Sequence, residues 1–310
     1  MNWSGVMPAA TTPFDERFAV DHNLLSQHTA WQLENGCSGL VMLGSLGEGA
    51  TLEHDEKVAV LKTAIKASEQ KGTPVVAAIS ALSTSAAVKL AKEAEEVGCS
   101  GLMVLPPYVY VSDFTEMKQH VSAIFGATKL SCMLYNNPVA YVTDFLPSHM
   151  AELASEFENF HAVKESSTDV RRVTAIREVL DDRLKILVGV DDAIVEGIAA
   201  GACGWVAGLV NAFPRESVEL FNLALEGKQK EAFQLYKWFL PLLRLDTVPK
   251  FVQLIKWVQE ETGTGVARVR RPRTEPYGEV LKDAQAILKT ALANRPTVKS
   301  TPFPALQEAS

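Results

Sequence analysis

The chain of 310 residues lacks the segments and motifs that mark several large classes of protein. No apolar stretch approaches the roughly 20 residues that a helix needs to cross a bilayer. The amino terminus has no basic segment followed by a long apolar one, so it does not resemble a secretory signal. Neither a P-loop nor a G-x-G-x-x-G pattern is present, which disfavours the common nucleotide sites. We therefore expect a cytoplasmic protein that binds neither membranes nor nucleotides.

Cysteine and histidine are also scarce. The four cysteines have no C-x-x-C spacing, and the six histidines form no H-E-x-x-H motif, so we expect neither a metal site nor a cofactor. Each cysteine lies in or beside an apolar run, which is typical of buried free thiols in a reducing compartment. They are Cys37, Cys99, Cys132 and Cys203.

The charge balance disfavours nucleic acid as a partner. The formal net charge is −7, whereas a nucleic-acid-binding domain usually carries a basic surface. The segment Arg268–Arg273 is locally basic. We expect this segment to cap a helix or to line a contact between subunits.

The chain does contain a repeated joint between a helix and a strand. The segment Gly36-Cys37-Ser38-Gly39-Leu40-Val41 recurs as Gly98-Cys99-Ser100-Gly101-Leu102-Met103, and more loosely as Gly201–Val206. A glycine just past a helix end adopts the left-handed conformation that closes the helix. The apolar run that follows is short and does not alternate, as in a parallel strand buried on both faces.

Further apolar runs bring the expected strands to about eight, separated by amphipathic segments. This alternation predicts a (β/α)8 TIM barrel. The alternative, an open doubly wound sheet, normally carries a glycine-rich phosphate loop after its first strand, and residues 11–14 are not such a loop. The additional strands are expected at residues 5–10, 75–79, 130–135, 160–164 and 186–190, and the helices at 21–34, 55–70, 83–97, 114–125, 146–156, 169–180 and 192–200.

After the eighth strand the pattern changes to consecutive helices, expected at residues 216–226, 229–243, 247–261 and 278–293. The tail that follows is rich in Pro, Thr and Ser, which is typical of poorly ordered termini. We predict a catalytic barrel over residues 1–212, a C-terminal helical domain over residues 213–295 and a loosely ordered tail over residues 296–310.

Lys164 stands at the carboxyl end of the apolar run 160–164. Burial of an ammonium group lowers its pKa and leaves a neutral, nucleophilic amine. Such an amine can condense with a ketone to form an iminium, which then serves as an electron sink. The alternatives are a lysine that extends its charged end to solvent, or an ion pair with Glu165.

The other strand ends carry groups that fit this chemistry, because catalysis in a (β/α)8 barrel takes place at the carboxyl ends of the strands. The turn 44–47 offers N–H groups and a hydroxyl that suit a carboxylate, although it is also consistent with a plain glycine turn. Tyr135 could move protons, or be an ordinary tyrosine at the barrel rim. Asp191 and Asp192 could bind substrate hydroxyls, and for Asp192 we favour a role as helix cap.

Together these strand ends predict one pocket that holds a 2-oxo acid as a Schiff base. We assign Lys164, Tyr135 and Ser45 as its catalytic residues. The predicted substrate-binding residues all lie at strand ends, and they are Leu46, Gly47, Tyr108, Ser166, Gly189, Asp191 and Gly208.

Three motifs resemble the dihydrodipicolinate synthase / N-acetylneuraminate lyase superfamily of class I (Schiff-base) lyases. They are G-[ST]-x-G-E at residues 44–48, Y-N-x-P at 135–138 and K-[ED]-[ST] at 164–166, and the resemblance runs from Gly5 to roughly Arg273. It implies Lys164 as the Schiff-base lysine, Tyr135 as the proton shuttle, and Ser45 with the Leu46 N–H as the carboxylate site. It also implies a (β/α)8 barrel with a helical C-terminal domain, assembled as a homotetramer of tight dimers.

Departures from the family pattern bear on the substrate. Dihydrodipicolinate synthases usually carry two threonines at Ser45 and Leu46, an arginine at Ala140 and a tyrosine at Val109. The resemblance therefore implies a lyase for a small 2-oxo acid or cyclic imine, acting by aldol cleavage or condensation, or by dehydration or deamination. Dihydrodipicolinate synthase proper and a non-catalytic 2-oxo acid sensor on the same barrel are the alternatives.

Overall fold

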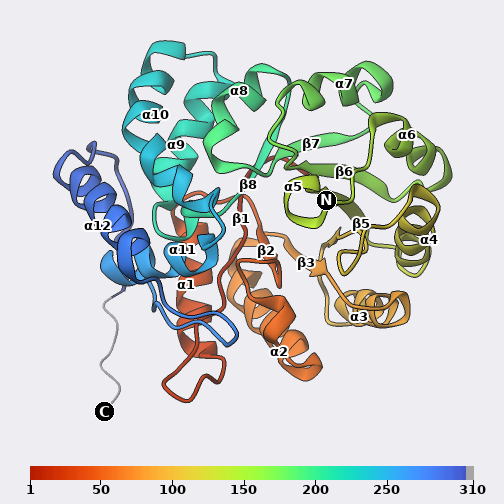
Figure 1. Ribbon diagram of the computed structural model, residues 1–310, viewed down its shortest axis with the longest axis horizontal. Coiled ribbons are helices and arrows are strands. Elements are labelled where there is room, and N and C mark those ends of the chain that lie inside the picture. Colours follow the sequence, from red (N-terminus) through yellow and green to blue (C-terminus); the bar gives the residue numbers. More distant parts are fainter. Residues whose placement is uncertain (305–310) are drawn as a thin grey trace.

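Eight parallel strands form one sheet that curves into a barrel (Figure 1). The structure, a computed structural model, describes residues 1–304. The strand order is β1-β8-β7-β6-β5-β4-β3-β2, and a bridge between Ala9 and Val41 joins the first strand to the second. The predicted (β/α)8 barrel is confirmed. The strands are β1 (Gly5–Pro8), β2 (Leu40–Met42), β3 (Val75–Ile79), β4 (Gly101–Val104), β5 (Ser131–Asn136), β6 (Phe160–Glu165), β7 (Lys185–Val188) and β8 (Gly204–Ala207).

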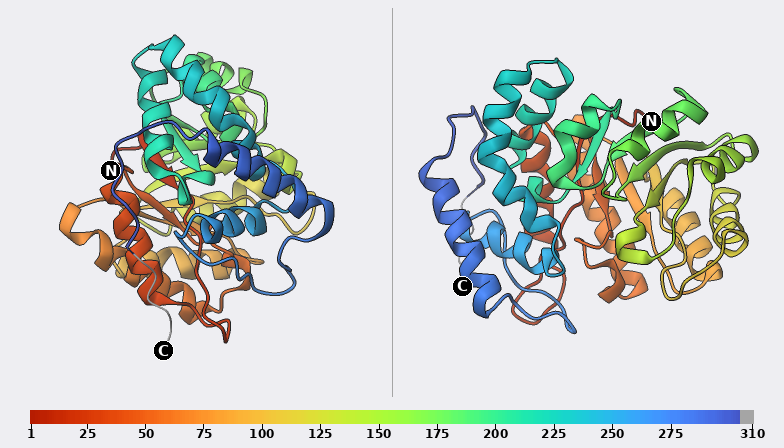
Figure 2. Two further views of the ribbon diagram at one scale, coloured as in Figure 1. Left: turned by 90° about the vertical axis from the view of Figure 1, so that its left-hand side faces the viewer. Right: turned by 45° about the horizontal axis from the view of Figure 1, so that its top comes forward.

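Helices surround the barrel, and four further helices lie together on one side of it (Figures 1 and 2). The short α5, which directly follows β5, was not predicted from the sequence. The barrel helices are α1 (His22–Glu34), α2 (His54–Ser68), α3 (Thr84–Glu96), α4 (Phe114–Phe125), α5 (Pro138–Tyr141), α6 (Pro147–Glu156), α7 (Arg171–Leu180) and α8 (Ile194–Ala199). The extension comprises α9 (Pro214–Leu225), α10 (Gln229–Leu243), α11 (Phe251–Glu261) and α12 (Gly278–Ala293).

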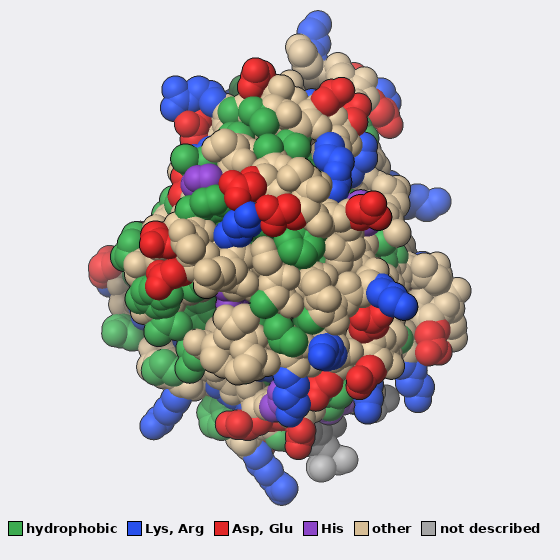
Figure 3. Space-filling view, turned by 90° about the vertical axis from the view of Figure 1, so that its right-hand side faces the viewer, with side chains coloured by type: hydrophobic (Ala, Val, Ile, Leu, Met, Phe, Trp, Pro, Cys, Tyr) green, Lys and Arg blue, Asp and Glu red, His purple; other side chains and the backbone are tan. Residues whose placement is uncertain are grey.

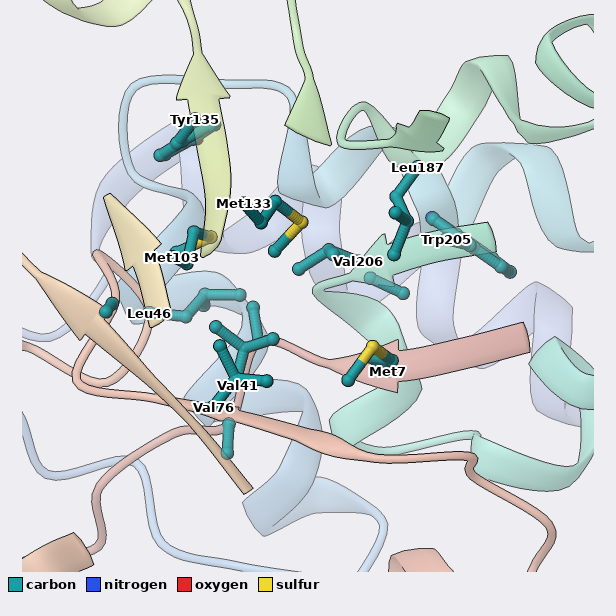
Figure 4. Close-up of a cluster of buried hydrophobic side chains, with 14 of the residues drawn as sticks. Met7, Val41, Leu46, Val76, Met103, Met133, Tyr135, Leu187, Trp205 and Val206 are labelled. Atoms are coloured by element: carbon teal, nitrogen blue, oxygen red, sulfur yellow. The ribbon is translucent and has the colours of Figure 1, made fainter. Parts of the chain in front are cut away.

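Apolar side chains from facing strands fill the barrel interior (Figure 4). Met7, Met133 and Val206 are buried there, and each of the remaining strands also contributes residues to the buried cluster. Two predicted site residues, Leu46 and Tyr135, belong to the same buried cluster. The packed core therefore supports the site from below and gives these two residues fixed positions.

The surface and the thiols match the composition. Acidic and basic side chains are interspersed over the face drawn in Figure 3. All four cysteines are free, and burial raises the pKa of the Cys99 and Cys132 thiols to about 12. Across residues 1–304, no helix has both the length and the apolar character needed to span a bilayer.

A buried ion pair joins the helical extension to the barrel. Lys256 Nζ of α11 donates to Glu48 Oε1 at 2.8 Å and to the Thr12 carbonyl at 2.9 Å. The two side chains are 1% and 0% exposed. Glu48 Oε2 also accepts the backbone N–H of Arg270 at 2.9 Å. Because Glu48 directly follows the turn 44–47, these bonds fix the loop at the end of β2.

The basic segment Arg268–Arg273 bonds to the N-terminal part of the chain, and the expected contact between subunits stays a prediction. The Arg270 guanidinium donates to both carboxylate oxygens of Glu56 at 2.6 Å. It also donates to the carbonyl of Phe18 at 2.8 Å. A bidentate pair of this kind has fixed geometry. The segment therefore crosses the N-terminal part of its own chain.

The C-terminal tail was predicted to be loosely ordered over residues 296–310. Its described part has no helix or strand, yet Trp31 of α1 donates its indole N–H to the Thr301 carbonyl at 2.8 Å. The Phe303 ring also lies edge-on to Trp31, with centroids 5.1 Å apart. Residues 305–310 lie outside the described residues.

We predict that Lys256→Met destabilises the protein by about 3–5 kcal/mol, because it leaves the buried Glu48 carboxylate without its cation. Urea unfolding measures this loss. The matched control is Lys282→Met, which breaks an exposed pair with Glu279 and should change stability by less than about 0.5 kcal/mol. Equal effects in the two variants would show that the buried pair does not hold the extension in place.

Candidate active site

Lys164 and Tyr135 lie side by side at the carboxyl ends of β6 and β5. The strand register pairs them directly, and Lys164 Nζ lies 4.2 Å from the centroid of the Tyr135 ring. Their residues are 6% and 7% exposed. The structure thus brings together the two residues predicted to form the catalytic centre, inside the barrel mouth.

The amine of Lys164 makes no hydrogen bond or ion pair with any residue in 1–304. Glu165 lies on the opposite face of β6, because successive strand residues alternate in direction. Its carboxylate oxygens accept from the Ser167 N–H at 2.7 Å and from Asn136 Nδ2 at 3.1 Å. The alternative of a Lys164–Glu165 ion pair is therefore wrong, and the burial of Lys164 does not fit a lysine that reaches into solvent.

Burial lowers the pKa of Lys164, since its charged form loses solvation. Asp246, Tyr141 and Asp191 oppose this shift through their charges. The net direction is downward, which favours the neutral amine that a nucleophile requires.

The loop after β2 is held in an uncommon backbone conformation. Leu43 and Glu48 have positive φ angles of 67° and 51°. Between them, the N–H groups of Leu46 and Gly47 donate to no other residue in 1–304. Two free N–H groups beside the Ser45 hydroxyl match the predicted cradle for a carboxylate.

Tyr141, on α5, is a site residue that the sequence analysis missed. Its hydroxyl lies 2.7 Å from Ser45 Oγ. Its ring packs edge-on against Tyr135, with centroids 5.7 Å apart, and lies 5.8 Å from the Tyr108 ring. Burial raises the pKa of both Tyr141 and Tyr135. Its only signal in the sequence is its place directly after Ala140, close to the Y-N-x-P motif.

Asn137 and Gly189 shape the surroundings of the catalytic pair. Asn137 Nδ2 donates to the Tyr135 hydroxyl oxygen at 3.0 Å, which leaves the phenol proton free for another acceptor. A methyl group added at Gly189 would lie 2.0 Å from Ser166 Oγ and 2.6 Å from Lys164 Cε. Gly189 therefore makes room for Lys164, and the Ser166 hydroxyl is buried there without a partner in 1–304.

Asp191, which was predicted to bind substrate, has its carboxylate turned to backbone N–H groups instead. It is fully buried, and its carboxylate accepts from the N–H groups of Gly208 at 3.0 Å and Leu209 at 2.8 Å. The Trp205 indole donates to it as well, at 3.1 Å. Burial raises its pKa to about 6 against these bonds. Asp191 thus fixes the loop after β8, including the predicted residue Gly208.

Asp192 does not cap the next helix, which corrects the favoured expectation. The residue before α8 is Ala193, and no side chain caps that helix. The Asp192 carboxylate instead lies 3.4 Å from the Arg244 guanidinium.

Asp246, at the end of the 3-10 turn η5 (Arg244–Asp246), is a second residue that the sequence did not reveal. It acts electrostatically on both Lys164 and Tyr135. No local motif marks it, because its position depends on how α10 and α11 pack on the barrel.

Comparison with known proteins shows the family and the fold of the chain. The model of the "Dihydrodipicolinate synthetase family" matches residues 2–293. The 4-hydroxy-tetrahydrodipicolinate synthase of Chelativorans sp. (strain BNC1) is 33% identical over 238 residues, which cover 77% of this chain and 81% of the relative. The synthase of the same name from Agrobacterium fabrum is 31% identical over 285 residues, covering 91% and 97%. The solved 4-hydroxy-tetrahydrodipicolinate synthase of Methylacidiphilum fumariolicum SolV superposes with a TM-score of 0.90 at 28% identity, covering 94% and 97%.

Proposed function

Because the chain belongs to the dihydrodipicolinate synthetase family, we propose that Lys164 forms a Schiff base with a small 2-oxo acid. Family membership makes the protein an enzyme of the class I Schiff-base lyase superfamily. The observation that supports the assignment of Lys164 is its buried, unpaired amine against the Tyr135 ring. A sensor would not require such an amine.

In the first step, neutral Lys164 attacks the C2 carbonyl of the 2-oxo acid. The substrate carboxylate is held by the Ser45 hydroxyl and by the N–H groups of Leu46 and Gly47, which are converging donors of the kind that carboxylates prefer. The resulting carbinolamine loses its hydroxyl as water, with a proton that Tyr135 supplies, and an iminium forms.

Tyr141 and Ser45 complete the proposed proton path. The Ser45 hydroxyl is 2.7 Å from that of Tyr141, whose ring contacts Tyr135. Loss of a proton from C3 of the iminium then gives an enamine. This enamine can attack a second carbonyl and form the C3–C4 bond, as in an aldolase, or expel a group from C4, as in a dehydratase or deaminase. In the direction of aldol cleavage the enamine forms instead when the C3–C4 bond of the iminium breaks and the C4 hydroxyl loses its proton to become a carbonyl.

Synthesis of 4-hydroxy-tetrahydrodipicolinate is the second candidate, favoured by the names of the relatives. The residue at the position of the family's usual arginine is Ala140, which offers no charge to a second carboxylate. We therefore rank synthesis of 4-hydroxy-tetrahydrodipicolinate as less well supported than a lyase activity on a different 2-oxo acid or cyclic imine.

We also propose that the enzyme works in the cytoplasm as a homotetramer built from tight dimers. Support for association comes from exposed apolar side chains in the loops after β4 and β5, which would lose contact with water at an interface. They include Val109, Val111, Val139 and Val142.

Borohydride treatment in the presence of pyruvate should add a reduced pyruvate adduct to Lys164, because the iminium is trapped as a stable amine. Intact mass and peptide mapping locate the adduct. The adduct should be absent from Lys164→Ala. Failure to trap the wild type, or trapping that persists in this variant, would contradict the assignment of the nucleophile.

Tyr141→Phe should lower kcat by about 10²-fold, because proton transfer by a positioned group contributes 10²–10⁴-fold. KM should change much less, since the N–H groups of the cradle remain. The control is Tyr277→Phe, at an exposed residue outside the site, which should turn over normally. An unchanged kcat in Tyr141→Phe would remove Tyr141 from the proton path.

A further inference from the structure

We propose that Asp246 recognises the part of the substrate beyond C3. It would select 2-oxo acids or cyclic imines with a hydroxyl or amino group at C4 over those with a second carboxylate in that region. The inference rests on the proposed Schiff base at Lys164 and adds the substrate class to it.

The helical extension brings Asp246 directly against the barrel. A methyl group added at Gly208 would lie 2.1 Å from Asp246 Oδ1 and 2.6 Å from Oδ2. The carboxylate therefore occupies the space that any side chain at position 208 would take, at the carboxyl end of β8. Its support, η5, connects α10 to the segment that leads into α11 (Figure 1).

One oxygen of the Asp246 carboxylate accepts no hydrogen bond from the described residues. Its Oδ1 is buried and has no hydrogen-bond partner among residues 1–304. By contrast, Asp191 accepts three N–H groups, and Asp192 faces Arg244. An unsatisfied buried acceptor is costly, so a donor on the ligand gains free energy by bonding to it.

The charges around Asp246 determine which ligand group can approach. Burial raises its pKa well above the ordinary range, Asp191 and Asp192 add to the increase, and Lys164 opposes it. Two of its three charged neighbours are therefore carboxylates. A hydroxyl or amine would supply the donor that Oδ1 lacks, whereas an ionised carboxylate of a substrate has no hydrogen to donate and would add negative charge near Asp191 and Asp192.

The order of the strands gives the two ends of a substrate separate partners. In the ring, β2 lies opposite β6, and β8 lies between them, two strands from each. The C1 carboxylate can therefore rest on the Ser45 loop after β2 while C4 faces Asp246 above β8. The same 2-oxo acid would bond to Lys164 at C2.

Borohydride trapping of matched 2-oxo acids tests this assignment. The probes are pyruvate, 2-oxopentanoate, 4-hydroxy-2-oxopentanoate and 2-oxoglutarate, and the readout is the concentration that gives half-maximal adduct on Lys164, counting intact acid and released pyruvate together. Wild type should prefer the 4-hydroxy acid over 2-oxopentanoate by about 10-fold or more, as expected when a donor on the ligand satisfies a buried, unpartnered acceptor. It should bind 2-oxoglutarate most weakly.

Asp246→Ala should reduce the preference for the 4-hydroxy acid to within about 2-fold and improve 2-oxoglutarate by about 10-fold, since both follow from one carboxylate. Pyruvate, which has no C4, is the reference acid within each variant, because loss of Asp246 also changes the charge that acts on Lys164. Gly208→Ala, which displaces the carboxylate, should shift the same two ratios, each measured against pyruvate in that variant. Glu231→Gln, at an exposed residue of α10, is the control and should match wild type.

Three results would overturn the inference. If pyruvate and borohydride give no adduct on the wild-type protein, the proposed Schiff base is wrong, and the inference that depends on it is wrong as well. Normal pyruvate trapping with an unchanged 4-hydroxy preference in Asp246→Ala removes only the role of Asp246. An equal loss for all four acids in both variants shows that Asp246 holds the fold and does not select the substrate.

Discussion

Desolvation of Lys164 is the constraint on which the site depends. The side chain is buried at the carboxyl end of β6, where an ammonium group loses most of its hydration. No described carboxylate pairs with it, and the nearest aromatic face is that of Tyr135. The barrel thus favours a neutral amine, while Asp246 and Asp191 limit how far the pKa falls. The reactivity of the lysine follows from this balance between burial and nearby negative charge.

The helical extension takes part in the site as well as in the fold. Lys256 of α11 fixes Glu48, and through it the loop whose free N–H groups are proposed to bind the substrate carboxylate. The turn before α11 carries Asp246 to the end of β8, two strands from β2 in the ring. The 11-residue segment from Asp246 to Lys256 would therefore position both ends of the proposed substrate. Substitutions in the helical extension should therefore alter substrate specificity even though they leave residue 164 itself unchanged.

The sequence was sufficient to predict the barrel and the placement of Tyr135 beside Lys164 at its mouth. Glycine joints and short apolar runs are local signals, and adjacent parallel strands place Tyr135 beside Lys164 in register. The rest depended on tertiary contacts. Tyr141 reaches Ser45 only because α5 turns back over the mouth, and Asp246 comes from a helix packed outside the barrel. The position of Asp191 at a strand end predicted a substrate ligand. In the structure it is buried, and its carboxylate oxygens accept the backbone N–H groups of Gly208 and Leu209.

The central claim is that Lys164 reacts as a neutral amine because it is buried. The pH dependence of the rate of imine formation with pyruvate tests this most directly, since it reports the pKa of the nucleophile in the free enzyme. Only the neutral amine attacks, so the rate should fall as the pH falls through the pKa of Lys164. The account predicts a midpoint well below the ordinary lysine value of about 10.4. A rate that keeps rising up to that pH would contradict it.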